Sequence, residues 1–396
     1  MKPAKIVMVG SGGYAVNHVE NLLNAKMAQN CTLVAVVDPF AKKSLQYDNF
    51  KNLVPVYDTL QEFYLNHTAD LAFIATPIPL HVKQCITAME NGSHVLCEKP
   101  LVPTMAELEL LQAKSDATGK TIAVAFQWCH SDTMLAIKRR IISGELGRPI
   151  SMKTYVTWPR TWAYYSRSWA GKRKNADGEL IHDSVLTNAT AHYLQNMLFL
   201  LGENMIQSAY MSDIKAECYR ANFRDPMHTL ANEMSDIETF DTIALKGKVA
   251  GADIFFTSSH ATNYKLLHPS MDYTFENARV LINFANQDGD CVIHYKDGRI
   301  EYMGQGVGNG LWDRIAYNAQ SAMGLRPWCC TIETVRPFTQ LIDYVFENVT
   351  VKDFPPNFIV NDSDTRATYV KNLHIDLLDC YNFGRLPSEM GLGWAL

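Results

Sequence analysis

The residues that decide the fold lie close to the start of the chain and read Ile6-Val7-Met8-Val9-Gly10-Ser11-Gly12-Gly13-Tyr14-Ala15. The apolar run at 6–9 is typical of a buried strand, and it passes directly into a glycine cluster of the form G-x-G-x-x-G/A. An amphipathic stretch follows, and then a second apolar strand that ends at Asp38, 23 residues after Ala15. This order of strand, glycines, helix, strand and acidic residue predicts a dinucleotide-binding βαβ unit.

Each position of the glycine loop has a physical role in such a unit. Gly10 allows the tight turn out of the strand, Gly12 lets the backbone approach a pyrophosphate, and Ala15 lets the helix pack closely on the sheet. The N–H groups at the start of the helix attract the phosphate charge. The loop residues expected to bind the cofactor are Gly10, Ser11, Gly12, Gly13, Tyr14 and Ala15.

Asp38 bears on which dinucleotide the loop accepts. Its carboxylate would accept hydrogen bonds from the adenosine ribose and would repel a 2′-phosphate, which favours NAD over NADP. NADP use stays open as the less favoured alternative, because Lys42 and Lys43 follow Asp38 closely.

The alternation of strands and helices continues to about residue 125. Apolar runs predict strands at 54–56, 71–75, 94–97 and 122–125, and helices are expected over 81–91 and 104–118. This pattern predicts an α/β fold with a doubly wound parallel sheet, in which ligands bind at the carboxyl ends of the strands. The residues expected near the nucleotide at those ends are Thr76, Pro77, His81, Glu98, Lys99 and Gln127.

The pattern changes after residue 128. A linking helix is expected over 131–143, followed by strands at 150–157, 239–245, 248–258, 279–284 and 291–294, and then by helices over 333–348 and 364–381. Short turns such as Lys246-Gly247 and residues 296–299 predict an open, mostly antiparallel sheet. We therefore expect an NAD-binding Rossmann domain over 1–128 and an α+β domain over 129–396.

Several motifs resemble the Gfo/Idh/MocA oxidoreductases, a family that includes glucose–fructose oxidoreductase and inositol dehydrogenase. Residues 70–77, His81 and residues 92–101, which contain Glu98-Lys99-Pro100, match its first signature, and residues 144–147 match a later G-x-x-G segment. The resemblance is strong to about residue 150 and weaker afterwards. It implies a Rossmann domain followed by a domain that binds substrate and whose open sheet forms an oligomer interface.

The resemblance also implies two catalytic residues, Lys99 and His192. In the family, the lysine contacts the nicotinamide ribose and the reacting hydroxyl, and the histidine of a second signature, D-x-G-x-H-x-x-D, is the acid/base. Here Asn188 and Gln195 replace the two Asp residues of that signature. Because Asn188 lies four residues before His192 in a helix expected over 187–201, both should share one face. An Asn orients a hydroxyl or the imidazole but cannot act as a carboxylate base.

Aromatic residues crowd into one short segment of the second domain. Between residues 155 and 169 the chain carries three Tyr and three Trp, with Arg160 and Arg167 among them. This mixture suits a carbohydrate, whose C–H faces lie on aromatic rings, although packing against the core or a partner subunit is the alternative. Trp169 is expected beside the nicotinamide. The residues expected to bind substrate are Lys99, Trp128, Arg160, Trp162, Tyr164, His182, Asp183, Asn188 and His192.

Composition narrows the function classes. The 396 residues carry 36 Lys+Arg against 41 Asp+Glu, which gives a formal net charge of −5 and no basic footprint for nucleic acid or an anionic membrane. Nine scattered cysteines without a C-x-x-C pair fit a cytoplasmic protein, and no metal site is expected. Only 19% of the residues are charged, which hints at a homodimer or homotetramer.

Three functions remain open at this point. The first is an NAD-dependent oxidoreductase that acts on a secondary alcohol or ketone of a sugar, cyclitol or sugar derivative. The second is an NAD-dependent glycosidase that oxidises its sugar transiently, eliminates the substituent and reduces the sugar again. The third is a nucleotide-binding sensor without catalytic activity.

Overall fold

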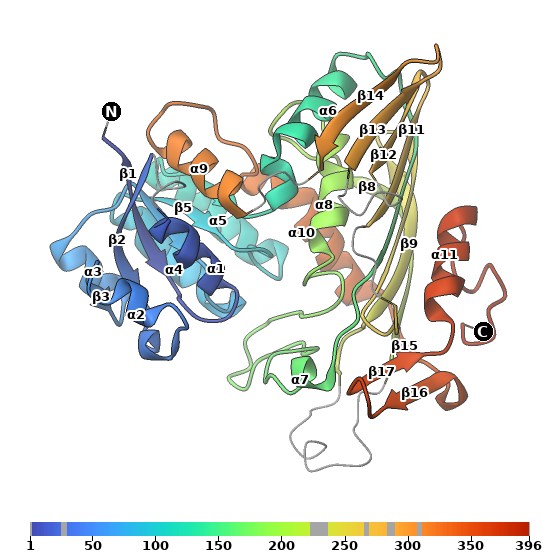
Figure 1. The fold of residues 1–396 in the computed structure, drawn as a ribbon, viewed down its shortest axis with the longest axis horizontal. Coiled ribbons are helices and arrows are strands. Elements are labelled where there is room, and N and C mark those ends of the chain that lie inside the picture. Colours follow the sequence, from blue (N-terminus) through green and yellow to red (C-terminus); the bar gives the residue numbers. More distant parts are fainter. Residues whose placement is uncertain are drawn as a thin grey trace. The chain divides into compact units, whose positions relative to one another are not determined.

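The computed structural model describes residues 2–24, 30–221, 237–264, 269–282, 290–306 and 311–395. The chain divides into two compact units (Figure 1). The first unit comprises Met1–Leu135, Met205–Gln207 and Val307–Thr339, and the second comprises Ala136–Asn204, Ser208–Gly306 and Gln340–Leu396.

The first unit is built on a parallel sheet. Within the described residues its strands are β1 (Ala4–Val9), β2 (Cys31–Val37), β3 (Val56–Tyr57), β4 (Leu71–Ile74), β5 (His94–Cys97) and β6 (Ile122–Val124). Their order in the sheet is β3-β2-β1-β4-β5-β6, and every pairing is parallel. The doubly wound parallel sheet is thus confirmed, and the order of its strands reverses between β1 and β4.

Two groups of helices cover this sheet. Ile6 and Met8 of β1 and Phe73 of β4 share a buried cluster with α1 (Ala15–Leu23) and with α9 (Leu311–Ala322), which lies against α1 (Figure 1). The alternate strand residues point to the other face. There α4 packs between α3 and α5 and also contacts β4 and β5. The remaining helical bounds in this unit are α2 (Tyr47–Phe50), α3 (Leu60–Asn66), α4 (His81–Glu90), α5 (Met105–Thr118), η1 (Ala41–Lys43), η2 (Ile78–Leu80) and η3 (Gln127–His130).

The second unit is built on a larger mixed sheet. Among the described residues its order is β14-β13-β12-β11-β7-β10-β9-β8-β15. All pairings are antiparallel except β7 with β10 and β8 with β15, so an open, mostly antiparallel sheet is confirmed. The strands are β7 (Pro149–Thr157), β8 (Met211–Arg220), β9 (Thr242–Val249), β10 (Ala252–Ser259), β11 (Ser270–Phe275), β12 (Ala278–Ile282), β13 (Asp290–Tyr295), β14 (Ile300–Gln305) and β15 (Val351–Asp353), with a separate hairpin of β16 (Ile359–Asp362) and β17 (Ala367–Val370).

The helices that follow residue 131 complete the fold. In the second unit, α11 (Leu373–Phe383) packs on β7 and β10, and α8 (Ala191–Leu200) also contacts β7. The other bounds are α6 (Asp132–Ile142), α7 (Trp162–Tyr165), α10 (Ile332–Asn348) and η5 (Pro356–Phe358). Both α6 and α10 continue from one unit into the other.

Three sequence-based expectations for the second unit were wrong. The helix expected over 364–381 is replaced by β17 and α11, because Arg366 and Asn372 take left-handed backbone conformations with φ of 51° and 56° that interrupt a helix. The turn expected at Lys246-Gly247 lies inside β9, and the chain reverses instead at Ala250. A further expectation, the strand over 279–284, is not one of the three errors: it overlaps β12, and its end lies outside the described residues.

The third error is the helix expected over 187–201, of which only α8 forms. Hydroxyl side chains hold the preceding segment in turns: Thr187 Oγ1 donates to the His182 carbonyl at 2.6 Å, and Thr190 Oγ1 donates to the Val185 carbonyl. Side-chain bonds of this kind compete with helical ones. Asn188 therefore does not share a helical face with His192.

The units also differ in extent from the domains expected on either side of residue 128. The segment that carries α9 packs with the Rossmann sheet, although it lies far along the chain. None of the described helices is long and apolar enough to cross a membrane.

Candidate functional site

The residues that follow the parallel strands lie in a row along the carboxyl edge of the first sheet. The N–H groups of Gly10, Ala75, Glu98 and Ala125 each donate to the last residue of the neighbouring strand over 2.8–2.9 Å. Ligands of doubly wound folds bind at this edge, beside the point where the strand order reverses.

The glycine loop fits a pyrophosphate. Gly10 has φ of +91°, and a Cβ there would lie 2.5 Å from the Ala75 carbonyl oxygen, so the turn requires glycine. A Cβ on Gly12 would meet nothing within 4 Å, which leaves open space above the exposed loop. Tyr14 precedes α1 without forming a side-chain cap, and the first turn of α1 carries no acidic residue. The N–H groups and dipole at this helix start are therefore suited to an anion.

Asp38 lies at the end of β2 and ties the glycine loop to that strand. Its carboxylate accepts hydrogen bonds from the Ser11 N–H at 2.8 Å, from the Ser11 hydroxyl at 2.7 Å and from the Phe40 N–H at 2.8 Å. Two carboxylate oxygens offer about four acceptor positions, so this half-buried group keeps capacity for a ribose hydroxyl. The residues present thus fit NAD.

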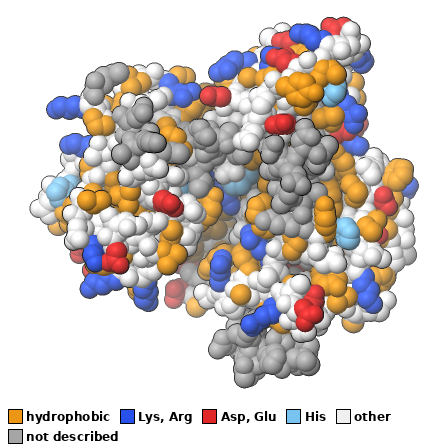
Figure 2. Space-filling model, in the orientation of Figure 1, with side chains coloured by type: hydrophobic (Ala, Val, Ile, Leu, Met, Phe, Trp, Pro, Cys, Tyr) orange, Lys and Arg blue, Asp and Glu red, His pale blue; other side chains and the backbone are white. Residues whose placement is uncertain are grey.

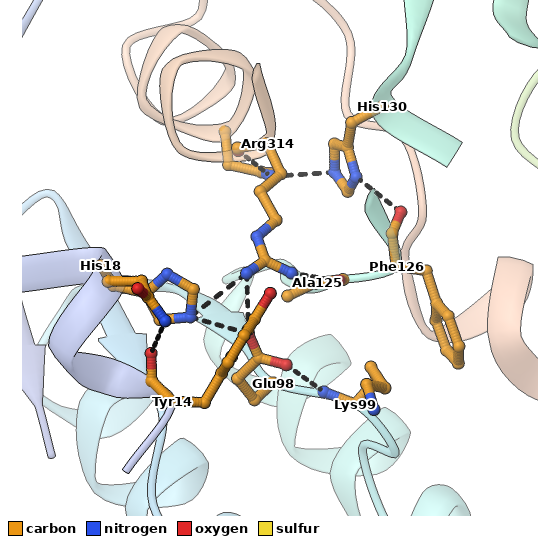
Figure 3. A network of polar contacts seen from close by, with 10 residues as sticks. Tyr14, His18, Glu98, Lys99, Ala125, Phe126, His130 and Arg314 are labelled. Carbon is orange, nitrogen blue, oxygen red and sulfur yellow. Dashed lines mark hydrogen bonds and ion pairs between the residues drawn. The ribbon is translucent and has the colours of Figure 1, made fainter. Parts of the chain in front are cut away.

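Glu98 belongs to a buried polar cluster that the sequence did not reveal (Figure 3). Its Oε1 atom lies 2.9 Å from His18 Nε2 and 3.0 Å from Arg314 Nη2, and its Oε2 atom accepts the Lys99 N–H at 3.1 Å. The Arg314 Nη1 atom also donates to the Ala125 carbonyl at 2.7 Å. His18 and Arg314 are both 0% exposed. We call Glu98, His18 and Arg314 the Glu98 cluster.

Opposing effects set the charges in the Glu98 cluster. Burial by itself would raise the pKa of Glu98, but Arg314 and His18 outweigh it and hold that pKa well below its usual range. Burial lowers the pKa of His18, which keeps its imidazole neutral at neutral pH. The cluster therefore pairs one carboxylate with one guanidinium.

His81 links two parts of the carboxyl edge. Its Nε2 lies 2.9 Å from the Thr76 carbonyl and its Nδ1 lies 3.0 Å from the Leu101 carbonyl, and the ring is 1% exposed. Burial lowers the pKa of His81. Both ring nitrogens of His81 contact backbone oxygens. His81 therefore holds the loops that carry Thr76 and Lys99 in place and has no ring nitrogen left for a cofactor.

The other predicted residues of the first unit occupy the same edge. Thr76 donates its hydroxyl to Gln84 at 2.5 Å, and Pro77 precedes η2. Lys99 is half-buried directly after Glu98. Gln127 and Trp128 begin η3, where Trp128 is buried.

In the second unit, Asn188 connects an arginine to a carboxylate. Its Oδ1 accepts Arg160 Nη2 at 3.1 Å, and its Nδ2 donates to Asp183 Oδ1 at 2.9 Å. Asp183 is buried and accepts the Gly171 N–H at 2.7 Å through its other oxygen. Asn188 thus stands between a guanidinium and the carboxylate of Asp183.

The aromatic segment divides between a core and a polar edge. Trp162 is 4% exposed, donates its indole N–H to Thr368 at 3.0 Å and belongs to a buried cluster that includes Tyr165 and Trp394. We therefore leave Trp162 out of the proposed substrate site. Tyr164 is 7% exposed and belongs to the same buried cluster; the guanidinium of half-buried Arg160 covers its ring at 4.3 Å, and Trp169 contacts it edge-on with ring centroids 5.6 Å apart.

The two predicted histidines of the second unit have different surroundings. His182 has φ of +51° and stacks on Phe346, with ring centroids 4.2 Å apart and 7° between the planes. His192 is the second residue of α8 and is 9% exposed.

The surface adds little that is specific. On the face that Figure 2 shows, Lys and Arg side chains are interspersed with Asp and Glu rather than gathered by sign. Within the described residues, no cluster of His, Cys, Asp and Glu could hold a metal ion.

Comparison with known proteins agrees with this geometry. Residues 4–126 match the Gfo/Idh/MocA family, described as "Oxidoreductase family, NAD-binding Rossmann fold". The scyllo-inositol 2-dehydrogenase (NAD(+)) of Bacillus subtilis is 28% identical over 151 residues, which is 38% of this chain and 44% of the relative. The matches to the first curated relatives span about half of their length, between 44% and 64%.

Solved structures share the fold over most of the chain. The WlbA dehydrogenase from Bordetella pertussis, in complex with NADH and UDP-GlcNAcA, has a TM-score of 0.66 at 20% identity and covers 87% of this chain and 96% of its own. A levoglucosan dehydrogenase in complex with NADH and levoglucosan has a TM-score of 0.68 at 15% identity, with coverage of 87% and 97%. The glycine loop, Asp38 and the Glu98-Lys99-Pro100 motif lie on one sheet edge, within the residues 4–126 that match the NAD-binding Rossmann domain of the Gfo/Idh/MocA oxidoreductase family.

Proposed function

We propose that the protein is an NAD(H)-dependent oxidoreductase that acts on a secondary alcohol or ketone of a sugar, cyclitol or sugar derivative. The observation that carries this proposal is the position of Lys99 directly after β5, on the edge that also carries the glycine loop and Asp38. A dinucleotide held by that loop and Asp38 supplies hydride acceptance and return.

The chain's own residues would handle the charge and the proton. The Nζ atom of Lys99 provides positive charge for a hydroxyl that becomes an alkoxide, which stabilises the transition state electrostatically. The imidazole of His192 takes the hydroxyl proton and returns it in the reverse direction, the acid/base role for which histidine is the usual side chain. Arg160 and Asn188 orient the sugar hydroxyls, and Asp183 fixes Asn188.

The polar edge of the second unit supports a polyhydroxylated substrate. Arg160 is half-buried and pairs with Asn188, so guanidinium and amide groups lie together, and such groups hydrogen-bond the hydroxyls of a sugar. The relatives named inositol and levoglucosan dehydrogenases are consistent with this class.

Turnover by two variants tests the proposal. Lys99→Ala and His192→Ala should each lower NADH formation on an active sugar by about 10²–10⁴-fold, the range for losing a positioned acid/base or charge. NAD binding, measured by titration of the protein fluorescence, should be retained. The exposed residues Lys83 and His294 supply matched controls, Lys83→Ala and His294→Ala, which should behave as wild type. Unchanged turnover in both site variants would refute the assignment.

A further inference from the structure

The Glu98 cluster joins parts of the chain that lie far apart in the sequence. His18 comes from α1, Glu98 follows β5, and Arg314 comes from α9, 296 residues after His18 (Figure 3). Arg314 is 0% exposed and contacts the ends of two neighbouring strands through separate nitrogens. Burying a guanidinium costs desolvation free energy, which hydrogen bonds and an opposite charge must offset.

The distances assign the proton of His18. Its Nε2 atom lies 2.9 Å from Glu98 Oε1 and 3.2 Å from Arg314 Nη2, and Arg314 Nη2 is itself 3.0 Å from the same carboxylate oxygen. Arg314 can only donate, so a neutral imidazole satisfies the carboxylate best with its proton on Nε2. The buried Nδ1 then carries a lone pair that has no hydrogen-bond partner among the described residues.

The Glu98 carboxylate therefore accepts hydrogen bonds from three donors, and its charge is compensated within the protein. His18 and Arg314 occupy Oε1, and the Lys99 N–H occupies Oε2. The bond to the Lys99 N–H connects the buried charge pair to the backbone of the residue proposed to polarise the substrate.

We propose that Arg314 is a positioning residue: by compensating Glu98 and bridging it to the Ala125 carbonyl, it holds the backbone at Lys99 and the nicotinamide side of the cofactor edge in place. The α9 segment thereby completes the dinucleotide site, although it follows the last Rossmann strand by nearly two hundred residues in the sequence. Asn318, one turn further along α9, extends the same attachment by donating to His130 Nε2 at 2.9 Å.

Charge-state variants test this role through NAD binding, without any sugar. In Arg314→Met the buried carboxylate loses its counter-charge, and we expect the Kd for NAD to rise about tenfold or more. In the double variant Glu98→Gln with Arg314→Met both charges are absent, and binding should recover most of that loss. Arg314→Lys keeps the charge but cannot reach both Glu98 and Ala125 as a fork, so an intermediate Kd is expected. Arg336, which pairs with the exposed carboxylates Glu109 and Glu333 in the same unit, gives the control Arg336→Met with wild-type binding.

The pH profile of NAD binding separates positioning from a general loss of structure. The titratable and charged groups that interact with Glu98 are His18 and Tyr14 from the start of α1, His81 from α4, Arg314 from α9 and the neighbouring Cys97 and Lys99. In wild type Glu98 stays ionised between pH 5 and 8. It therefore takes up no proton in this range and adds no step to the plot of the Kd for NAD against pH. In Arg314→Met only His18 and Lys99 still oppose the burial effect, so the pKa of Glu98 should rise and a new step should appear there. It should be absent from the double variant and from Arg314→Lys.

Two results would overturn the proposal. One is a folded Arg314→Met that binds NAD as wild type does at every pH. The other is a double variant as impaired as the single one, which would remain informative even if Arg314→Met failed to fold. The inference rests on NAD binding by the proposed oxidoreductase. Because no sugar is used, a wild type that binds NAD but turns over no sugar would refute the proposed function without affecting this test.

Discussion

Replacing two glycines of the same loop should separate folding from cofactor binding. In Gly10→Ala the new Cβ would lie 2.5 Å from the Ala75 carbonyl oxygen, and the backbone would be held at φ of +91°. The left-handed conformation costs about 1–2 kcal/mol and the overlap about 1–3 kcal/mol, so we expect a loss of about 2–5 kcal/mol in unfolding free energy. At about 2–4 °C per kcal/mol, the Tm should fall by roughly 4–20 °C.

Gly12→Ala is the matched variant. Its Cβ would meet nothing within 4 Å and its φ is outside the left-handed region, so the Tm should stay within about 2 °C of wild type. The methyl group would instead occupy the space above the loop, and losing one charge-assisted hydrogen bond to a phosphate costs about 1.5–3 kcal/mol, or about a tenfold to hundredfold rise in Kd.

Thermal unfolding followed by tryptophan fluorescence, together with NAD titration of each purified variant, measures both effects. We expect a large Tm loss for Gly10→Ala alone and a large rise in the Kd for NAD for Gly12→Ala at normal Tm. A Gly12→Ala variant that binds NAD with wild-type affinity would refute the assignment of this loop to the pyrophosphate.

Three further perturbations have defined outcomes. Asp38→Asn removes the negative charge at the end of β2 but keeps an acceptor for Ser11, so the ratio of the Kd for NADP to that for NAD should fall about tenfold by fluorescence titration; an unchanged ratio would exclude Asp38 from the choice. Burial raises the pKa of Asp241 to about 7, above its unfolded value, so its neutral form stabilises the fold at low pH and this contribution is lost as pH rises towards 7. Asp241→Asn should therefore gain unfolding free energy relative to wild type, on the order of 1–3 kcal/mol, between pH 4 and 8 in urea titrations, and a constant difference would contradict the shift. Arg160→Gln should raise the KM for sugar about tenfold and leave the Kd for NAD unchanged, whereas a change in NAD binding alone would place Arg160 elsewhere.

The cofactor edge could be predicted because its signals are local. Gly10, Gly12, Asp38 and Glu98 each follow a strand that the apolar pattern identifies, and parallel topology then brings the strand ends together. Arg314 gave no such signal. It lies on an amphipathic helix that sequence reasoning did not assign, and its partners His18, Glu98 and Ala125 lie at least 189 residues earlier.

The aromatic segment shows a different limit of sequence reasoning. A cluster of rings suits a sugar site and a hydrophobic core equally, since both bury large apolar surfaces. Trp162 belongs to a core because Val370 and Trp394, from the end of the chain, pack in the same cluster. Likewise, the turn around Asn188 depends on Thr187 and Thr190 hydroxyls, which helix periodicity does not take into account.

The central claim is net hydride transfer from a sugar-like alcohol to NAD. The most direct test incubates the full chain with NAD and a panel of sugars, cyclitols and glycosides, and measures NADH absorbance and sugar products together. The proposal predicts that NADH accumulates in a one-to-one ratio with oxidised sugar, and that Lys99→Ala abolishes both. Cleavage of a glycoside without net NADH would contradict it in favour of the NAD-dependent glycosidase, and NAD binding without conversion of any compound would favour a sensor.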